Sequence, residues 1–537
     1  MSTPRGAQPD LDVAIVGAGF AGLYAVYRLR ERGLSVRAFE RGSGVGGTWY
    51  WNRYPGARCD VESLFYCYSF SEELYRDWQW TERYPAQPEL LAYLNHVADR
   101  FDLRKDIELD TLVTSVEFDE ETSLWTVSTD RGSQTARFVV MATGCLSSAF
   151  DPHLPGQDTF GGDIYFTSSW PDQDVDLRDR RVALIGTGSS GIQVSPRIAE
   201  VAEHLYVLQR TPNYSIPAWN APISPAMAAL AKDGLPTLRQ LMRESPMNIP
   251  FTQRKVSATE EDPETLQRNL EASWATGGVV MSLIYPGVIR DEGVNKVFAD
   301  FVADKVRAKV HDPEVAEKLI PKSYPFAAKR LCSDTGYFEI YNRDTVTLVD
   351  LTESPIERIV EHGIELRDGT VLEVDTIVFA TGFDAMTGTL LRTGITGREG
   401  VPLREAWADG PTTYLGLGIP GFPNLFVVAG PGSPSVLANM VPSIEFHVDW
   451  IADAITTLRE SGATTIEATE DAGREWTEHV DRIGQRTLYP RAGSWYMGSN
   501  IPGKRQGLML YTGGTVEYRR RLEEVVANGY EGWAISS

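Results

Sequence analysis

The chain has 537 residues, of which 42% are hydrophobic and 23% are charged, a balance typical of a globular protein. This length accommodates about three domains of roughly 150 residues each. The formal net charge of −22 repels polyanions, so nucleic acid and acidic membrane surfaces are excluded as expected partners.

The first predicted element is a strand, turn and helix near the N-terminus. An apolar strand runs into Gly17-x-Gly19-x-x-Gly22, and the pattern becomes helical from Leu23. In a dinucleotide-binding turn, such glycines permit the tight turn, the close approach of a pyrophosphate and the packing of helix on strand. A second strand ends in Glu40, 23 residues after Gly17, where a carboxylate accepts hydrogen bonds from a ribose. The first site is therefore predicted to bind a nucleotide with free ribose hydroxyls.

A second copy of the pattern, Gly186-x-Gly188-x-x-Gly191, again follows an apolar strand. Its next strand ends in Arg210, at the position that corresponds to Glu40. A cation there favours the 2′-phosphate of NADP, although a solvated surface arginine would look the same in the sequence. Two dinucleotide domains of different 2′ chemistry indicate electron transfer from NADPH to a second cofactor, most simply FAD.

Two small-residue turns, 142–144 and 380–382, both read Ala-Thr-Gly after an apolar strand and suit the points where the chain crosses between domains. The predicted fold is therefore α/β, with two Rossmann-like dinucleotide-binding domains and a helical insertion. The expected limits are 1–145 with 383–537 for the FAD domain, 152–221 with 329–380 for the NADP domain, and 222–328 for the insertion. The segment "AGSWYMGSNIPGKR" near the C-terminus is expected to be a loop that folds over a ligand.

Several other classes of protein are not expected. The four cysteines form no C-x-x-C pair and the seven histidines are scattered, so no metal is predicted. A cytoplasmic protein without a membrane span is predicted, because the cysteines are few and unpaired, the N-terminus is polar and no apolar run reaches about 18 residues. A monomer or weak oligomer is expected.

Long segments of the chain resemble type I Baeyer–Villiger monooxygenases, most closely the phenylacetone and steroid monooxygenase branch. They include "GVGGTWYWNRYPGARCDVES", "GTGSSGIQVSP", "ATGFDAMTG", "GPGSPSVLANM" and "SWYMGSNIPGK". The resemblance implies bound FAD and NADP(H), and conversion of ketones to esters or lactones with NADPH and O2 through a flavin C4a-peroxide. Oxidation of sulfides is a further expectation.

One motif of this family departs from its usual form. The family reads F-x-G-x-x-x-H-x-x-x-W-P or W-D, whereas this chain has Phe160, Gly162, Phe166 and Trp170 at the four fixed positions before Pro171. In the family the motif links the domains and senses the nicotinamide nucleotide. A phenylalanine in place of histidine loses hydrogen-bonding capacity. Either tolerated drift or a shift toward peroxide release is consistent with it.

By the same resemblance, Arg330 is the cation that stabilises the oxyanion of the reaction, and Asp60 holds it in place. A fixed guanidinium suits this task because it stays charged at any working pH. Without the family, the same pair would be interpreted as an ordinary ion pair.

The turns and the resemblance together predict the remaining site residues. Cofactor contacts are expected from Gly17, Gly19, Ala21, Gly22, Glu40, Gly47, Thr48, Trp49, Arg58, Cys59, Asp60, Val113, Thr187, Gly188, Ser189, Ser190, Gly191, Gln193, Arg210, Thr211, Lys329, Met440 and Trp495. The ketone pocket is expected to include Tyr54, Ser435, Val436, Leu437 and Met440.

Three alternatives share part of this pattern. A flavin-dependent N- or S-hydroxylating monooxygenase has both nucleotide turns but not the Arg330 and Asp60 features. A pyridine-nucleotide disulfide reductase needs a short-spaced cysteine pair, which Cys59 and Cys67 do not form. A non-catalytic NADP sensor would be colourless when purified.

Overall fold

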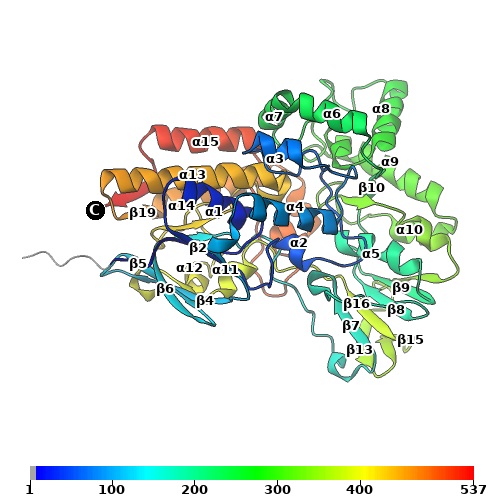
Figure 1. Cartoon of the computed structure of the whole chain (residues 1–537). Helices are drawn as coiled ribbons and strands as arrows, with labels where there is room; N and C mark the ends of the chain where they lie inside the picture. Colours follow the sequence, from blue (N-terminus) through cyan, green and yellow to red (C-terminus); the bar gives the residue numbers. More distant parts are fainter. Residues whose placement is uncertain (1–7) are drawn as a thin grey trace, which may run out of the picture.

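The computed structural model describes residues 8–537, which fold around two sheets with parallel cores (Figure 1). In Figure 1 the blue N-terminal segment lies with the orange and red C-terminal segments in one body. The segments coloured from cyan-green to yellow-green form the rest of the molecule. The first body is therefore assembled from both ends of the chain.

The first sheet has eight strands in the order β17-β4-β5-β6-β1-β2-β3, with β18 paired to β6. Strands β1, β2, β3, β6 and β18 pair in parallel, and β4, β5 and β6 form an antiparallel meander. The strand bounds are β1 Leu11–Val16, β2 Val36–Phe39, β3 Ile107–Glu108, β4 Val113–Asp119, β5 Leu124–Thr129, β6 Gly132–Met141, β17 Ile395–Thr396 and β18 Leu425–Val427.

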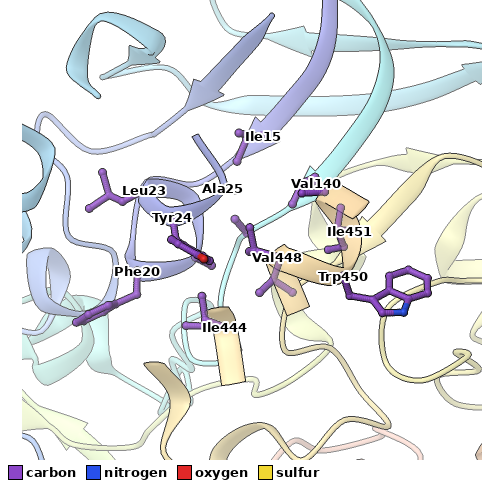
Figure 2. Close-up of a cluster of buried hydrophobic side chains, with 14 of the residues drawn as sticks. Ile15, Phe20, Leu23, Tyr24, Ala25, Val140, Ile444, Val448, Trp450 and Ile451 are labelled. Carbon is purple, nitrogen blue, oxygen red and sulfur yellow. The ribbon is translucent and has the colours of Figure 1, made fainter. Parts of the chain in front are cut away.

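Helices α1 (Phe20–Glu31) and α13 (Met440–Ser461) pack together on this sheet. Figure 2 shows Ile444, Val448 and Ile451 of α13 in the same buried cluster as side chains of α1 and of the central strands. Helix α1 begins at Phe20, earlier than the pattern from Leu23 predicts, because Gly19 is already its N-cap. The other elements of this body are α2 Thr48–Trp51, α3 Glu72–Asp77, α4 Gln87–Arg100, α11 Gly388–Arg392, α12 Leu403–Ala406, α14 Glu470–Gly484, α15 Thr515–Ala527, β19 Thr465–Ala468 and β20 Trp533–Ser536.

The second sheet is wholly parallel, in the order β12-β9-β8-β16-β7. Its strands are β7 Asp163–Phe166, β8 Arg181–Ile185, β9 His204–Gln209, β12 Val346–Asp350 and β16 Thr376–Phe379, and helix α5 (Ser189–Ala199) follows β8. An antiparallel sheet of β13 Ile356–Val360, β14 Gly363–Leu366 and β15 Val371–Glu373 is inserted before β16.

The helical insertion emerges between two short paired strands, β10 (Ser215–Pro217) and β11 (Cys332–Asp334). Its helices are α6 Pro225–Asp233, α7 Leu235–Glu244, α8 Pro263–Thr276, α9 Glu292–Lys309 and α10 Pro313–Leu319. Gly234 separates α6 from α7. After the insertion, β11 pairs with β10, and the chain then enters the second sheet again at β12.

The chain crosses between the two bodies twice, and the crossings run side by side. The Phe150 N–H donates to Gly382 O at 3.1 Å, the Asp384 N–H to Ser148 O at 2.8 Å, and the Met386 N–H to Cys145 O at 2.9 Å. The two connectors therefore form one hydrogen-bonded hinge. Within residues 8–537 no helix is both long and apolar enough to cross a membrane, and no group of three or more His, Cys, Asp or Glu side chains is arranged to hold a metal ion.

Candidate functional site

The first glycine turn forms a cradle that a side chain would fill. Gly17 has φ +104°, and a Cβ there would lie 2.7 Å from Ala142 O. A Cβ on Gly22 would lie 1.9 Å from Gly17 O. Helix α1 therefore approaches β1 closely, and its first residues, with Gly19 as N-cap, line a cavity at the carboxyl end of the strand. A helix N-terminus in this position binds phosphate.

Glu40 follows β2 and is 5% exposed. Its Oε2 accepts the Ala18 N–H at 2.9 Å and its Oε1 accepts the Gly42 N–H at 2.9 Å. Each carboxylate oxygen has a further lone pair, so the fixed group can also accept a ribose hydroxyl. The first cradle thus fits a dinucleotide with an unmodified ribose.

The second turn repeats this geometry. Gly186 has φ +111°, and a Cβ there would lie 2.5 Å from Ala380 O. A Cβ on Gly191 would lie 2.1 Å from Gly186 O, whereas one on Gly188 would meet nothing within 4 Å. The open side of Gly188 and the N-terminus of α5 leave room for a pyrophosphate.

At the end of β9, Arg210 and Thr211 line the same cavity as Lys329. Burial and the positive charge of Arg210 lower the pKa of Lys329, and no carboxylate of the described residues is among the groups that shift it. Two neighbouring cations without a counter-charge fit a phosphate dianion. The arrangement suits the 2′-phosphate of NADP.

Arg330 and Asp60 form a bidentate ion pair in the same cavity. Arg330 Nε donates to Asp60 Oδ2 and a terminal nitrogen donates to Oδ1, both at 2.7 Å. The other terminal nitrogen donates to Val436 O at 2.6 Å. Burial alone would lower the pKa of Arg330, but Asp60 raises it well above its ordinary value. The guanidinium is therefore charged and held from two sides.

The residues predicted for the ketone pocket do not all reach the cavity. Tyr54 lines it and donates to Gln193 Oε1 at 2.9 Å. Val436 and Met440 also line it. Ser435 is fully buried with φ +42°, and Leu437 packs in a neighbouring apolar cluster. The strained turn at Ser435 therefore presents Val436, and not its own hydroxyl, to the cavity.

Trp495 lines the cavity from the C-terminal loop. This loop is fastened to the hinge, because Lys504 Nζ donates to Asp384 Oδ1 at 2.6 Å and to Ala385 O at 2.8 Å. Asn500 Nδ2 donates to Phe383 O at 2.8 Å. The loop that carries Trp495 and the connectors between the two bodies therefore form one wall.

The cavity that joins these groups has a volume of about 1310 Å³. Every cofactor residue predicted from the sequence lines it except Gly22 and Gly191, which lie beneath the turns. Of the residues predicted for the ketone pocket, Ser435 and Leu437 do not line it. The two cradles and the ion pair are thus parts of one site.

The sequence analysis missed a further set of cavity residues. They include Arg41, Thr111, Leu112, Ser148, Leu208, Asn213, Leu351, Ile356, Arg392 and Asn500. Arg41 stacks on Trp51, with its guanidinium carbon 4.4 Å from the ring centroid. Leu208 and Leu351 lie at or just beyond the carboxyl ends of β9 and β12, where doubly wound sheets bind their ligands, and that position was the available signal.

Phe166 ends β7 and does not line the cavity. Its ring stacks on Phe379 of β16, with centroids 4.9 Å apart and planes 15° apart. Ser168 and Ser169, separated from it by Thr167, do line the cavity. Phe166, the unusual residue of the linker motif, is therefore part of the apolar packing next to the cavity-lining residues Ser168 and Ser169.

The chain is similar to known proteins along nearly its whole length. Residues 10–244 match the family model described as "Flavin-binding monooxygenase-like". The chain is 42% identical over 533 residues to an acetone monooxygenase (methyl acetate-forming) from Gordonia sp. strain TY-5, covering 98% of this chain and 99% of the relative. It is 40% identical over 530 residues to phenazine N-monooxygenase PhzNO1 from Lysobacter antibioticus, covering 98% and 97%. The solved structure of an oxidized steroid monooxygenase bound to NADP superposes with a TM-score of 0.94 at 52% identity, covering 98% and 99% of the two chains.

Proposed function

The chain belongs to the Baeyer–Villiger monooxygenases, and from this premise we propose that its cavity inserts one oxygen atom of O2 beside the carbonyl of a ketone. The other oxygen atom leaves as water while NADPH is oxidised to NADP⁺. The products are esters from open-chain ketones and lactones from cyclic ones. The observation that carries the proposal is the bidentate Arg330–Asp60 pair inside the cavity that both cradles share.

FAD, when bound, accepts the electrons of NADPH and activates O2. The residues of the first cradle would hold it, from the Gly17 turn to Glu40 and the loop at Gly47 and Thr48. The residues of the second cradle, with Arg210 and Lys329, would hold NADPH. Since both cradles open into one cavity, the protein itself brings the two groups together.

Arg330 acts on the substrate. As the carbonyl carbon of the ketone is attacked, negative charge develops on the carbonyl oxygen, and a fixed guanidinium stabilises it. Asp60 keeps that guanidinium charged and oriented through two of its nitrogens, and Val436 O accepts a hydrogen bond from the third. The fixed orientation matters because a preorganised cation needs no rearrangement when the charge appears.

Product analysis with a ketone panel tests this function. Purified protein with NADPH and O2 should yield esters or lactones from aryl, cyclic or steroidal ketones, measured by chromatography with mass detection. Omitting ketone should leave only slow NADPH oxidation. Failure of every ketone in the panel to give an oxygen-inserted product would contradict the proposal.

N-oxygenation is the second candidate, because phenazine N-monooxygenase PhzNO1 is 40% identical over nearly the whole chain. The ion pair favours the ketone reaction, since transfer of oxygen to the lone pair of a ring nitrogen forms no carbonyl oxyanion for Arg330 to stabilise. A competition between a ketone and an aromatic nitrogen heterocycle separates the two. A dominant N-oxide product, with no ester, would reverse the assignment.

We also propose the domain limits expected from the sequence: 1–145 with 383–537 for FAD, 152–221 with 329–380 for NADP, and 222–328 as the insertion; residues 1–7 lie outside the residues that the structure describes. Their support is the separation into two sheets and the paired crossings near Cys145 and Gly382.

A further inference from the structure

Lys329 is a cation in an unfavourable place. It is half-buried beside Arg210, and both effects lower the pKa of its ammonium group. Its contact in the structure is an aromatic ring: Nζ lies 4.5 Å from the centroid of Tyr324. A ring face attracts a cation without neutralising it. Tyr324 therefore keeps Lys329 in position and leaves its charge available.

Tyr324 is itself buried, at 7% exposure, and its hydroxyl is hydrogen-bonded to the segment that follows Arg210 and Thr211. The Tyr214 N–H donates to this hydroxyl at 3.3 Å. The hydroxyl hydrogen has two acceptors within reach, Pro212 O at 3.0 Å and Asn213 Oδ1 at 2.9 Å. One side chain thus contacts three successive residues of the segment that follows Arg210 and Thr211.

The same segment is tied to the second glycine turn. Asn213 Nδ2 donates to Thr187 O at 2.7 Å, and Thr187 Oγ1 donates to Thr211 O at 3.0 Å. Displacing the segment 212–214 would therefore move the residues around Arg210 relative to the turn. Tyr324 connects the two cations through its ring on one side and its hydroxyl on the other.

We propose that Tyr324 is a positioning residue for recognition of the 2′-phosphate: its ring holds Lys329 and its hydroxyl holds the segment after Arg210, so that the two cations converge on one phosphate dianion. This inference rests on the proposed use of NADPH. Tyr324 acts through Lys329 and the segment after Arg210, since it is not among the residues that line the cavity.

Binding of 2′,5′-ADP and 5′-AMP to the holoenzyme, measured by calorimetry, tests the inference, because the two ligands differ only in the 2′-phosphate. Tyr324→Phe keeps the ring and loses the hydroxyl, and should weaken 2′,5′-ADP by about fivefold, the size of a typical hydrogen-bond loss. Tyr324→Leu loses both and should weaken it by about tenfold or more, because the cation–π contact is lost as well. Affinity for 5′-AMP should change little in either variant.

Tyr341→Phe is the matched control. Tyr341 is buried in the same hydrophobic cluster, and its hydroxyl donates to the Tyr337 hydroxyl at 2.8 Å. The control should leave the ratio of the two affinities unchanged. KM for NADPH, measured beside kcat, should rise in the Tyr324 variants with kcat nearly constant.

The outcomes distinguish failure of the proposed use of NADPH from failure of the proposed role of Tyr324. If the wild-type protein does not prefer 2′,5′-ADP over 5′-AMP, the proposed use of NADPH fails. If the wild type prefers it and Tyr324→Phe and Tyr324→Leu retain the same preference, the role of Tyr324 is overturned. Equal weakening of both ligands would also overturn it, since that indicates a merely structural tyrosine. Should Tyr324→Leu fail to fold, the ratio in Tyr324→Phe decides.

Discussion

Removing Arg330 gives the sharpest test of the catalytic geometry. Arg330→Ala deletes two hydrogen bonds of 2.7 Å to Asp60 and one of 2.6 Å to Val436 O. Loss of one fixed oxyanion stabiliser typically lowers the rate by about 10²–10³. Ester formation should fall by that factor, while NADPH oxidation continues because the second cradle is intact.

The ion pair also contributes to stability. The side chains of Arg330 and Asp60 are 24% and 21% exposed. Leaving one partner of a buried pair alone costs about 3–5 kcal/mol, and partial exposure places this pair near the lower figure, about 3 kcal/mol. Asp60→Ala should therefore destabilise the protein about as much as Arg330→Ala. The double variant should lose less than the sum, because no charge is then left unpaired.

Two measurements on the same variants check this reasoning. Ester formed per NADPH oxidised reports the catalytic role, and denaturant unfolding reports the stability of the pair. Arg343→Ala is the control, since this guanidinium donates to Ala199 O at 2.9 Å and does not line the cavity. An Arg330→Ala protein that retained the wild-type ester yield would refute the oxyanion role, and additive stability losses would refute the coupling.

Three further expectations can be checked in the same way. Arg210→Ala should raise KM for NADPH far more than KM for NADH, by about tenfold or more if one charge-assisted contact to the 2′-phosphate is lost; equal increases would count against the assignment. Phe166→His should lower the peroxide released per NADPH, with a small loss of stability because a polar ring replaces the stack on Phe379; an unchanged peroxide ratio would leave Phe166 a packing residue only. Burial lowers the pKa of His447 from 6.5 to about 3, and its Nδ1 accepts the Ala429 N–H at 3.0 Å. The unfolded chain therefore binds the proton first as pH falls, so the stability contributed by neutral His447 is present above pH 6.5 and is lost below it, by about 2 kcal/mol at pH 5. His447→Gln retains an acceptor, so the difference in unfolding free energy between wild type and variant should change by about 2 kcal/mol between pH 7 and pH 5; a difference that does not depend on pH would contradict this role of His447.

The cradles could be predicted from the sequence because their determinants are local. A strand, three glycines and a helix lie within a short stretch, and the structure places Gly17 and Gly186 at positive φ beneath a carbonyl. The predicted start of α1, at Leu23, was less accurate, because the helix begins at Phe20. The pattern from Leu23 marks where the buried face of the helix repeats, whereas the helix begins where Gly19 caps it.

The cavity residues that were missed come from long-range assembly. Leu351 follows β12 and Ile356 begins β13, and the places of these strands in their sheets are set by pairing with other segments, with no motif around either residue. Ser148 and Arg392 meet across the two connectors, where Arg392 donates to the Ser148 hydroxyl. Such contacts depend on the hydrogen bonds between crossings, which a local pattern does not contain.

The role of Phe166 depends on a residue outside the linker motif. The linker motif marked this position as unusual, and its meaning depends on Phe379, a residue of another strand. Parallel pairing of β7 with β16 sets Phe166 opposite Phe379, so the two rings stack. A histidine at this position would bring a polar ring into the apolar cluster around Ile164 and Phe379. Phenylalanine at position 166 is therefore matched to its partner strand, and the cavity-lining residues Ser168 and Ser169 lie in the short turn that follows this packed end.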